Sequence, residues 1–85
     1  MKVVCVYRDA SDHGSEVRGW LREFERRTGA GIETLDPDSK DGQYFCRLYD
    51  IVEYPTLIAV ASDGKMLEMW RGLPLPLIDH VAHYA

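Results

Sequence analysis

Cysteine is scarce in this sequence of 85 residues. Only Cys5 and Cys46 are present, and no third cysteine lies between them. The sequence therefore contains no C-x-x-C pair. Two cysteines do not make the disulfide framework that stabilises small secreted domains, so we expect two free thiols in a reducing compartment.

Long apolar runs are also missing. A helix that spans a bilayer needs about 20 consecutive apolar residues, and no such stretch occurs. After Met1-Lys2 only a short apolar segment precedes Arg8, which is too short for the apolar region of a secretory signal peptide. These features predict a cytoplasmic protein that makes no contact with a membrane.

The sequence has no excess of positive charge. Ten basic residues face 14 acidic ones, for a net charge of −4. Nucleic-acid binding needs clustered lysines and arginines, and here only Arg26 and Arg27 are adjacent arginines. We therefore expect no nucleic-acid partner. The hydrophobic fraction of 46% argues for a folded chain, and the length predicts one domain over residues 1–85.

The apolar pattern predicts seven elements in the order β-α-β-α-β-β-α. A continuous apolar run is typical of a buried strand, and apolar residues three and four apart are typical of a helix. The elements are the strand Lys2–Tyr7, the helix Ser15–Thr28, the strand Ile32–Leu35, the helix Ser39–Tyr49, the strands Leu57–Ala61 and Met66–Arg71, and a last helix from Pro76. They predict an α/β domain with a four-stranded mixed sheet and helices on both faces.

Helical spacing also predicts which side chains face the core. The residues expected to point inward are Val17, Trp20, Leu21 and Phe24 on the first helix, Phe45, Leu48 and Tyr49 on the second, and Leu77, Ile78, Val81, Ala82 and Tyr84 on the last. Ser11 or Asp12 is expected to cap the first helix, and Gly29 to end it.

A proline opens the third strand, and a turn closes it. Pro55 has no N–H to donate to a sheet, so it must lie at the start of a strand or at an edge. The X-Pro bond is the one peptide bond whose cis form is cheap, and we expect a cis peptide at Pro55. Asp63-Gly64 predicts a hairpin turn between the last two strands.

The element order and one segment together carry a resemblance to a known family. The residues from Tyr49 to Thr56 read YDIVEYPT, which resembles the "YxIxxxPT" segment of thioredoxins and glutaredoxins. The resemblance covers essentially the whole chain and implies a thioredoxin-like fold of minimal, glutaredoxin-like size.

The sequence departs from this family at the position of its redox chemistry. Thioredoxin-type exchange needs C-x-x-C at the start of the first long helix, where the helix lowers the pKa of the first thiol. The matching residues here are Ser11-Asp12-His13-Gly14. The resemblance thus implies the fold without dithiol oxidoreductase activity. If the alignment is right, Ser11→Cys combined with Gly14→Cys should create a reducible pair.

The resemblance also implies a binding site. In this family the residue before the cis-proline pairs with an extended peptide, which is a form of strand addition. The matching candidates are Tyr54 and Pro55, with Ser11, Asp12 and His13 across the groove. We therefore predict a redox-inactive domain that binds a protein or peptide as a monomer or weak dimer. We expect no cofactor and no metal, because His13 has no adequate set of further ligands nearby.

Two alternatives stay open from the sequence. One is a thiol oxidoreductase or thiol sensor that acts through Cys46, or that binds glutathione in the glutaredoxin manner. Arg47 is next to Cys46 and would favour a thiolate if both were exposed, whereas Cys5 is expected to be a buried core residue. The other alternative is a structural domain without a groove function.

Overall fold

Seven elements follow one another in the order predicted from the sequence. The computed structural model describes all residues from 1 to 85. The elements are β1 (Lys2–Val6), α1 (Gly14–Thr28), β2 (Glu33–Leu35), α2 (Lys40–Tyr49), β3 (Thr56–Val60), β4 (Met66–Arg71) and α3 (Ile78–Ala82). None of the helices is both long enough and apolar enough to cross a membrane.

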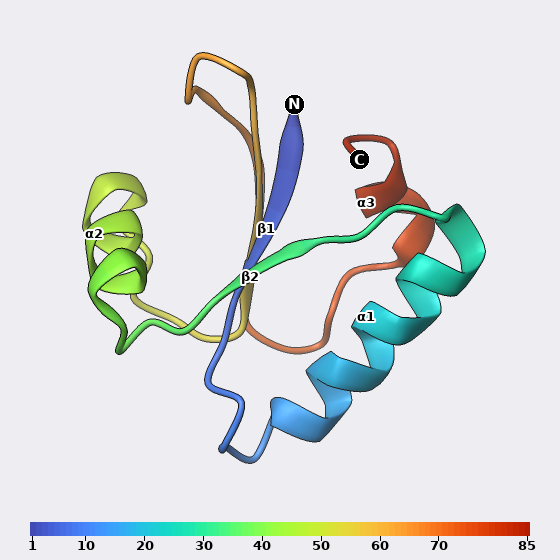
Figure 1. The fold of residues 1–85 in the computed structure, drawn as a ribbon, viewed down its shortest axis with the longest axis horizontal. Helices are drawn as coiled ribbons and strands as arrows, with labels where there is room; N and C mark the ends of the chain where they lie inside the picture. Colours follow the sequence, from blue (N-terminus) through green and yellow to red (C-terminus); the bar gives the residue numbers. More distant parts are fainter.

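The four strands form one mixed sheet in the order β2-β1-β3-β4. β1 is parallel to β2 and antiparallel to β3, and β3 is antiparallel to β4. Figure 1 shows α2 on one side of the sheet and α1 with α3 on the other. The predicted fold class, a four-stranded mixed sheet with helices on both faces, is confirmed.

Each face of the sheet has its own apolar core. Alternate residues of a strand point to opposite faces, so Val3 and Cys5 pack with α1 and α3, while Val4 and Val6 pack with α2. All five residues of β3 are buried. The continuous apolar runs in the sequence are thus the two central strands, which are covered by helices on both sides.

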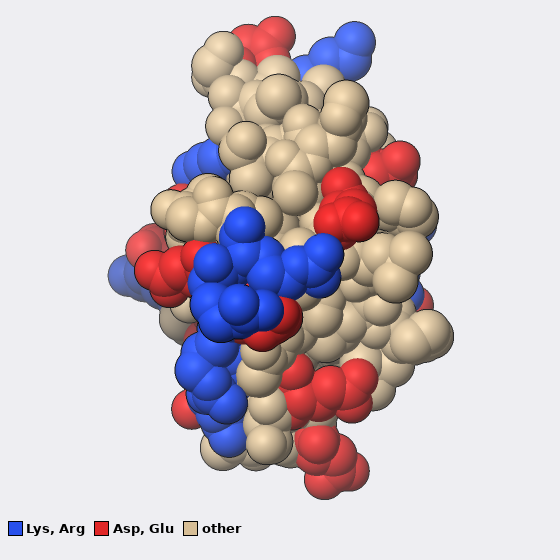
Figure 2. Space-filling model, turned by 90° about the vertical axis from the view of Figure 1, so that its right-hand side faces the viewer, with Lys and Arg blue, Asp and Glu red and all other residues tan.

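Helix α1 packs on the sheet through the predicted stripe. Val17 and Phe24 are fully buried, and the indole Nε1 of Trp20 donates to the carbonyl oxygen of Pro76 at 2.9 Å. The helix ends at Gly29, whose positive φ of 75° favours glycine, as predicted. Lys and Arg side chains gather on the outer face of the molecule on this side (Figure 2).

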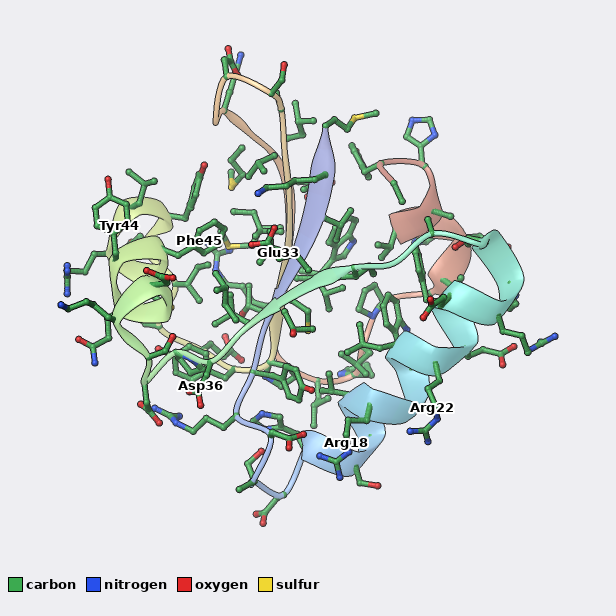
Figure 3. The ribbon with its side chains drawn as sticks, in the orientation of Figure 1. Arg18, Arg22, Glu33, Asp36, Tyr44 and Phe45 are labelled. Atoms are coloured by element: carbon green, nitrogen blue, oxygen red, sulfur yellow. The ribbon has the colours of Figure 1, made fainter.

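Two of the predicted inward residues point to solvent instead. Leu48 is 59% exposed and Leu77 is 67% exposed. Helix α2 turns the face with Phe45 and the buried Cys46 toward the sheet, and Leu48 lies outside this face. Leu77 precedes the first turn of α3, so helical spacing does not apply to it. In Figure 3, Phe45 points toward the sheet and Tyr44 away from it.

One end of the sheet brings four loops together. Leu35, Val6, Thr56 and Arg71 are register partners and form a single row across all four strands. The loops beyond this row comprise residues 7–13, 36–39, 50–55 and 72–77, and we call them the Pro55 end. It holds all of the site residues predicted from the sequence, except Cys46.

Candidate functional site

The loop before β3 presents a free segment of backbone at Tyr54. The Tyr54–Pro55 peptide bond is cis, and the Pro55 side chain is fully buried. The carbonyl oxygen of Pro55 accepts the Gly72 N–H at 2.7 Å, and the Thr56 hydroxyl donates to the Glu53 carbonyl at 2.5 Å. Neither the N–H nor the C=O of Tyr54 takes part in a hydrogen bond. The loop is therefore held on both sides of a residue whose own backbone groups have no hydrogen-bond partner within the chain.

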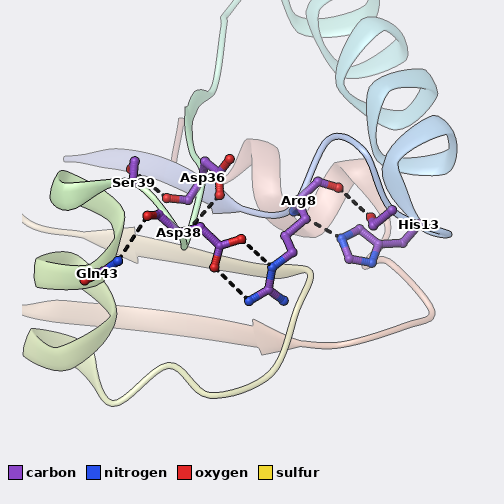
Figure 4. A network of polar contacts seen from close by, with 7 residues as sticks. Arg8, His13, Asp36, Asp38, Ser39 and Gln43 are labelled. Carbon is purple, nitrogen blue, oxygen red and sulfur yellow. Dashed lines mark hydrogen bonds and ion pairs between the residues drawn. The ribbon is translucent and has the colours of Figure 1, made fainter.

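The loop between β1 and α1 is closed by its own hydrogen bonds. The Ser11 hydroxyl donates to the Arg8 carbonyl at 2.5 Å, and the Arg8 N–H donates to His13 Nε2 at 3.3 Å (Figure 4). The expected cap at Ser11 or Asp12 is wrong, because His13 is the N-cap residue and no side chain caps α1. The ψ of His13 is −7°, so it lacks the extended backbone of a usual capping residue.

Arg8 connects this loop to two others. Its guanidinium forms two hydrogen bonds with the Asp38 carboxylate, at 2.9 and 3.0 Å (Figure 4). The same guanidinium lies 4.8 Å from the centre of the Tyr54 ring. The hydrogen bonds from Arg8 lower the pKa of Asp38 and raise that of Arg8 itself, so both groups stay charged. Arg8 thus fixes the loop after β1 against the loop after β2 and against Tyr54.

Gly14 leaves no room for a side chain at the start of α1. A Cβ atom at this position would lie 2.0 Å from the Asp9 carbonyl oxygen and 3.2 Å from the Arg18 guanidinium. The expectation that Ser11→Cys with Gly14→Cys makes a reducible pair stays a prediction, and a cysteine at residue 14 does not fit this backbone without a shift. A second thiol at residue 14 requires the loop to move away from the helix.

The two cysteines are free and lie on opposite faces of the sheet. Cys5 is fully buried, and burial raises its pKa to about 12. Cys46 is 8% exposed and borders a hollow of about 310 Å³ that Pro37, Gln43 and Tyr54 also line. Burial, and next the neighbouring Cys46, raise the pKa of Tyr54. Cys46 is thus the thiol that lies close to the Pro55 end.

Apart from Cys46, which lies on α2, the candidate residues from the sequence lie on two neighbouring loops. Arg8 links them, since it contacts both His13 and the Tyr54 ring. Asp12 is exposed and makes no hydrogen bond or ion pair. No three side chains of the types that ligate metals come together anywhere in the structure.

Arg8 and Asp38 were not among the predicted site residues. A signal for them was present in the sequence, because each is a charged residue shortly after one of the first two strands. Those strands are parallel neighbours, so the residues that follow them meet at one edge of the sheet.

Comparison with known proteins is informative at the level of the fold. No protein-family model matches the chain, and no curated protein matches its sequence. Its structure is similar to that of thioredoxin 1 from the thermophilic eubacterium Thermosipho africanus TCF52B, with a TM-score of 0.68. The fold is thioredoxin-like. The match covers 99% of this chain and 89% of the other. At 13% identity, the two thioredoxin-like chains share the fold, and activity does not follow from it.

Proposed function

We propose that this thioredoxin-like domain is redox-inactive and binds a protein or extended peptide at the Pro55 end. The observation that carries the proposal is the free N–H and C=O of Tyr54, in a loop fixed by the Pro55–Gly72 and Thr56–Glu53 hydrogen bonds. An extended peptide that pairs with these two groups adds a short strand by backbone hydrogen bonds. Ser11, Asp12 and His13 form the facing wall.

The chemistry of the first loop supports a site without thiol exchange. Residues 8–14 contain no cysteine, and the close contact between Gly14 and the Asp9 carbonyl opposes a side chain at residue 14. A serine hydroxyl at residue 11 cannot take the place of a thiolate in disulfide exchange. Cys5 has a pKa of about 12 and is buried, so it supplies no thiolate at neutral pH.

The test is a peptide selection followed by N-methylation. Peptides selected from a displayed library against the wild-type chain are synthesised, and each backbone amide is methylated in turn. If a peptide pairs with Tyr54, methylation at one or two positions weakens binding about fivefold or more, because a methyl group on a paired amide removes a backbone hydrogen bond. Fluorescence anisotropy measures the dissociation constants.

Two matched variants locate the bound peptide. Ser11→Tyr places a bulky side chain on the wall that faces Tyr54 and is expected to weaken binding. Ser62→Tyr places the same side chain in the exposed hairpin turn at the opposite end of the sheet and is expected to leave binding unchanged. Full tolerance of every N-methyl group, together with unchanged affinity in Ser11→Tyr, would remove the Tyr54 backbone from the proposal.

A second candidate function is single-thiol chemistry at Cys46. The observation in its favour is that Cys46 borders the hollow that Tyr54 and Pro37 line. Glutathione or another small thiol compound would have to enter this hollow to react. Turnover of a small disulfide that is lost in Cys46→Ser and kept in Cys5→Ser would establish this activity. Equal, background rates in all three proteins would eliminate it.

A further inference from the structure

The net charge of the chain is concentrated at the Pro55 end. Its loops carry six carboxylates, from Asp9, Asp12, Asp36, Asp38, Asp50 and Glu53, and one basic residue, Arg8. The carboxylates therefore exceed the basic residues by five, against a net charge of −4 for the whole chain. The rest of the chain holds nine basic and eight acidic residues, and the guanidinium of one of them, Arg18, lies at this end beside Asp9.

Two of these carboxylates are already neutralised by arginines. Arg8 holds Asp38, and Arg18 forms an ion pair with Asp9. Asp12 and Glu53 have no ion pair with a basic side chain. When Arg71 at the end of β4 is also counted, the Pro55 end still has more carboxylates than basic side chains. The negative potential at this end therefore comes from groups that still lack a cation.

Two of the unpaired carboxylates lie on the loops that carry the proposed site. Glu53 immediately precedes Tyr54, and its carboxylate lies against Gly72, the residue that bonds to the Pro55 carbonyl. Asp12 lies on the facing loop, which Arg8 fixes beside the Tyr54 ring. One unpaired carboxylate thus lies on each of the two loops that we propose to bind the peptide.

We infer that the ligand of this groove is an extended segment that carries lysine or arginine side chains beside its paired backbone. The inference rests on the proposed function, since it names the class of peptide that the Tyr54 backbone would bind. Side chains of a bound strand alternate in direction, so a segment with a basic residue at every second position brings its charges to one side. Asp12 and Glu53 then supply the carboxylates that its cations meet, while Arg8 stays compensated by Asp38.

Three probe peptides of equal length test the charge preference. They are acetylated and amidated pentapeptides with the sequences Lys-Val-Lys-Val-Lys, Gln-Val-Gln-Val-Gln and Glu-Val-Glu-Val-Glu. The expected order of affinity is lysine, then glutamine, then glutamate, with roughly tenfold between the first two at low salt. The lysine advantage should largely disappear at 1 M salt, where the screening length falls to about 3 Å.

A pair of double variants tests the location. Asp12→Asn with Glu53→Gln should weaken binding of the lysine peptide about fivefold and leave the glutamine peptide unchanged. Glu25→Gln with Glu68→Gln changes the net charge by the same amount, at exposed positions outside the Pro55 end. This control should leave the affinity for both peptides unchanged.

Each other result overturns the inference in a distinguishable way. Equal binding of all three peptides removes the charge preference and leaves the proposed function standing. An equal loss of affinity for the lysine peptide in both double variants shows a general attraction to an acidic protein, in which the Pro55 end has no special role. If none of the three peptides binds, while a library-selected peptide without basic residues binds the Tyr54 backbone, the ligand class is wrong and the function is right. If no peptide of any kind binds there, both fail.

Discussion

At the scale of single residues, Gly14 limits what the loop between β1 and α1 can carry. Its Cα packs so closely on the Asp9 carbonyl that a Cβ would lie 2.0 Å from that oxygen. Position 14 is the one at which the related redox motif would have its second thiol. A side chain at residue 14 therefore requires this loop to shift.

Gly14→Ala is expected to destabilise the protein by about 1–3 kcal/mol, because the added methyl group overpacks the start of the helix. Gly19→Ala is the matched control in the same helix. Its Cβ would meet nothing closer than 4.0 Å, so it should stabilise the chain by up to about 1 kcal/mol. Urea unfolding measures both. A Gly14→Ala variant as stable as the wild type would show that the loop relaxes easily.

Cys5 gives the protein a pH dependence in the alkaline range. Burial raises the pKa of its thiol from 9.0 to about 12, so the unfolded chain loses this proton first as the pH rises. Between these values the folded state binds more protons than the unfolded state, and the free energy of unfolding therefore falls, by about 1.4 kcal/mol per pH unit. Below pH 9 both states keep the proton and the thiol has no effect.

Comparison with Cys5→Ala isolates this contribution. The variant should be less stable at pH 8, because it leaves space in the core. The difference in unfolding free energy between the two proteins should shrink by about 1 kcal/mol from pH 8 to pH 10. Urea unfolding at pH 8, 9 and 10 measures it. A difference that stays constant over this range would mean that the Cys5 thiol ionises equally in both states.

At the scale of elements, the loops of the Pro55 end are joined by one side chain. Arg8 follows β1, Asp38 precedes α2 and Tyr54 precedes β3, and the Arg8 guanidinium contacts both of the others. These pairs are exposed, so they contribute little to global stability. Their effect is local, on how the loops are held relative to one another.

Arg8→Gln is expected to loosen these loops without unfolding the domain. Backbone amides in residues 8–13 and 36–39 should exchange with solvent several-fold faster, whereas those of β3 should not change. Arg26→Gln is the matched control, since Arg26 pairs with Glu23 inside α1. Exchange measured by mass spectrometry or NMR at neutral pH decides the outcome. Faster exchange throughout the sheet would show instead that Arg8 stabilises the whole fold.

The sequence predicted the elements better than it predicted the ends of helices. Continuous apolar runs identify the buried strands, and the spacing of apolar residues from Val17 to Phe24 identifies the first helix. Both signals arise because a helix or strand that is buried on a given face carries apolar residues at a regular spacing. Leu77 and Ser11 lie just before helices, where this regular spacing no longer applies. Local backbone geometry determines where their side chains point. Leu77 precedes the helix and is exposed, and Ser11 bonds to the Arg8 carbonyl in place of capping α1.

The site was predictable only in part for a related reason. Tyr54 and Pro55 are identified by a local segment, so the sequence suffices to name them. The contact between Arg8 and Asp38 joins residues 30 positions apart, and it depends on the parallel pairing of β1 with β2. The β-α-β order predicts two parallel strands, but it does not say which of the residues that follow them come into contact.

At the scale of the whole molecule, charge is distributed unevenly. The Pro55 end holds the excess of carboxylates, while Arg22 points outward from α1 on the side where basic residues gather (Figures 2 and 3). Such a distribution orients a charged partner before contact, and it does so less as salt is added. A partner with basic residues is therefore drawn toward the end that carries the free Tyr54 backbone.

The measurement that tests the central claim most directly is the NMR signal of the Tyr54 amide during titration with a selected peptide. Pairing predicts that this amide shifts strongly and becomes protected from solvent exchange, because its N–H gains an acceptor. The amide of Lys65, in the turn at the opposite end of the sheet, should not change. A saturable shift at Lys65 or along α1, with the Tyr54 amide unmoved and unprotected, would contradict binding at the Pro55 end.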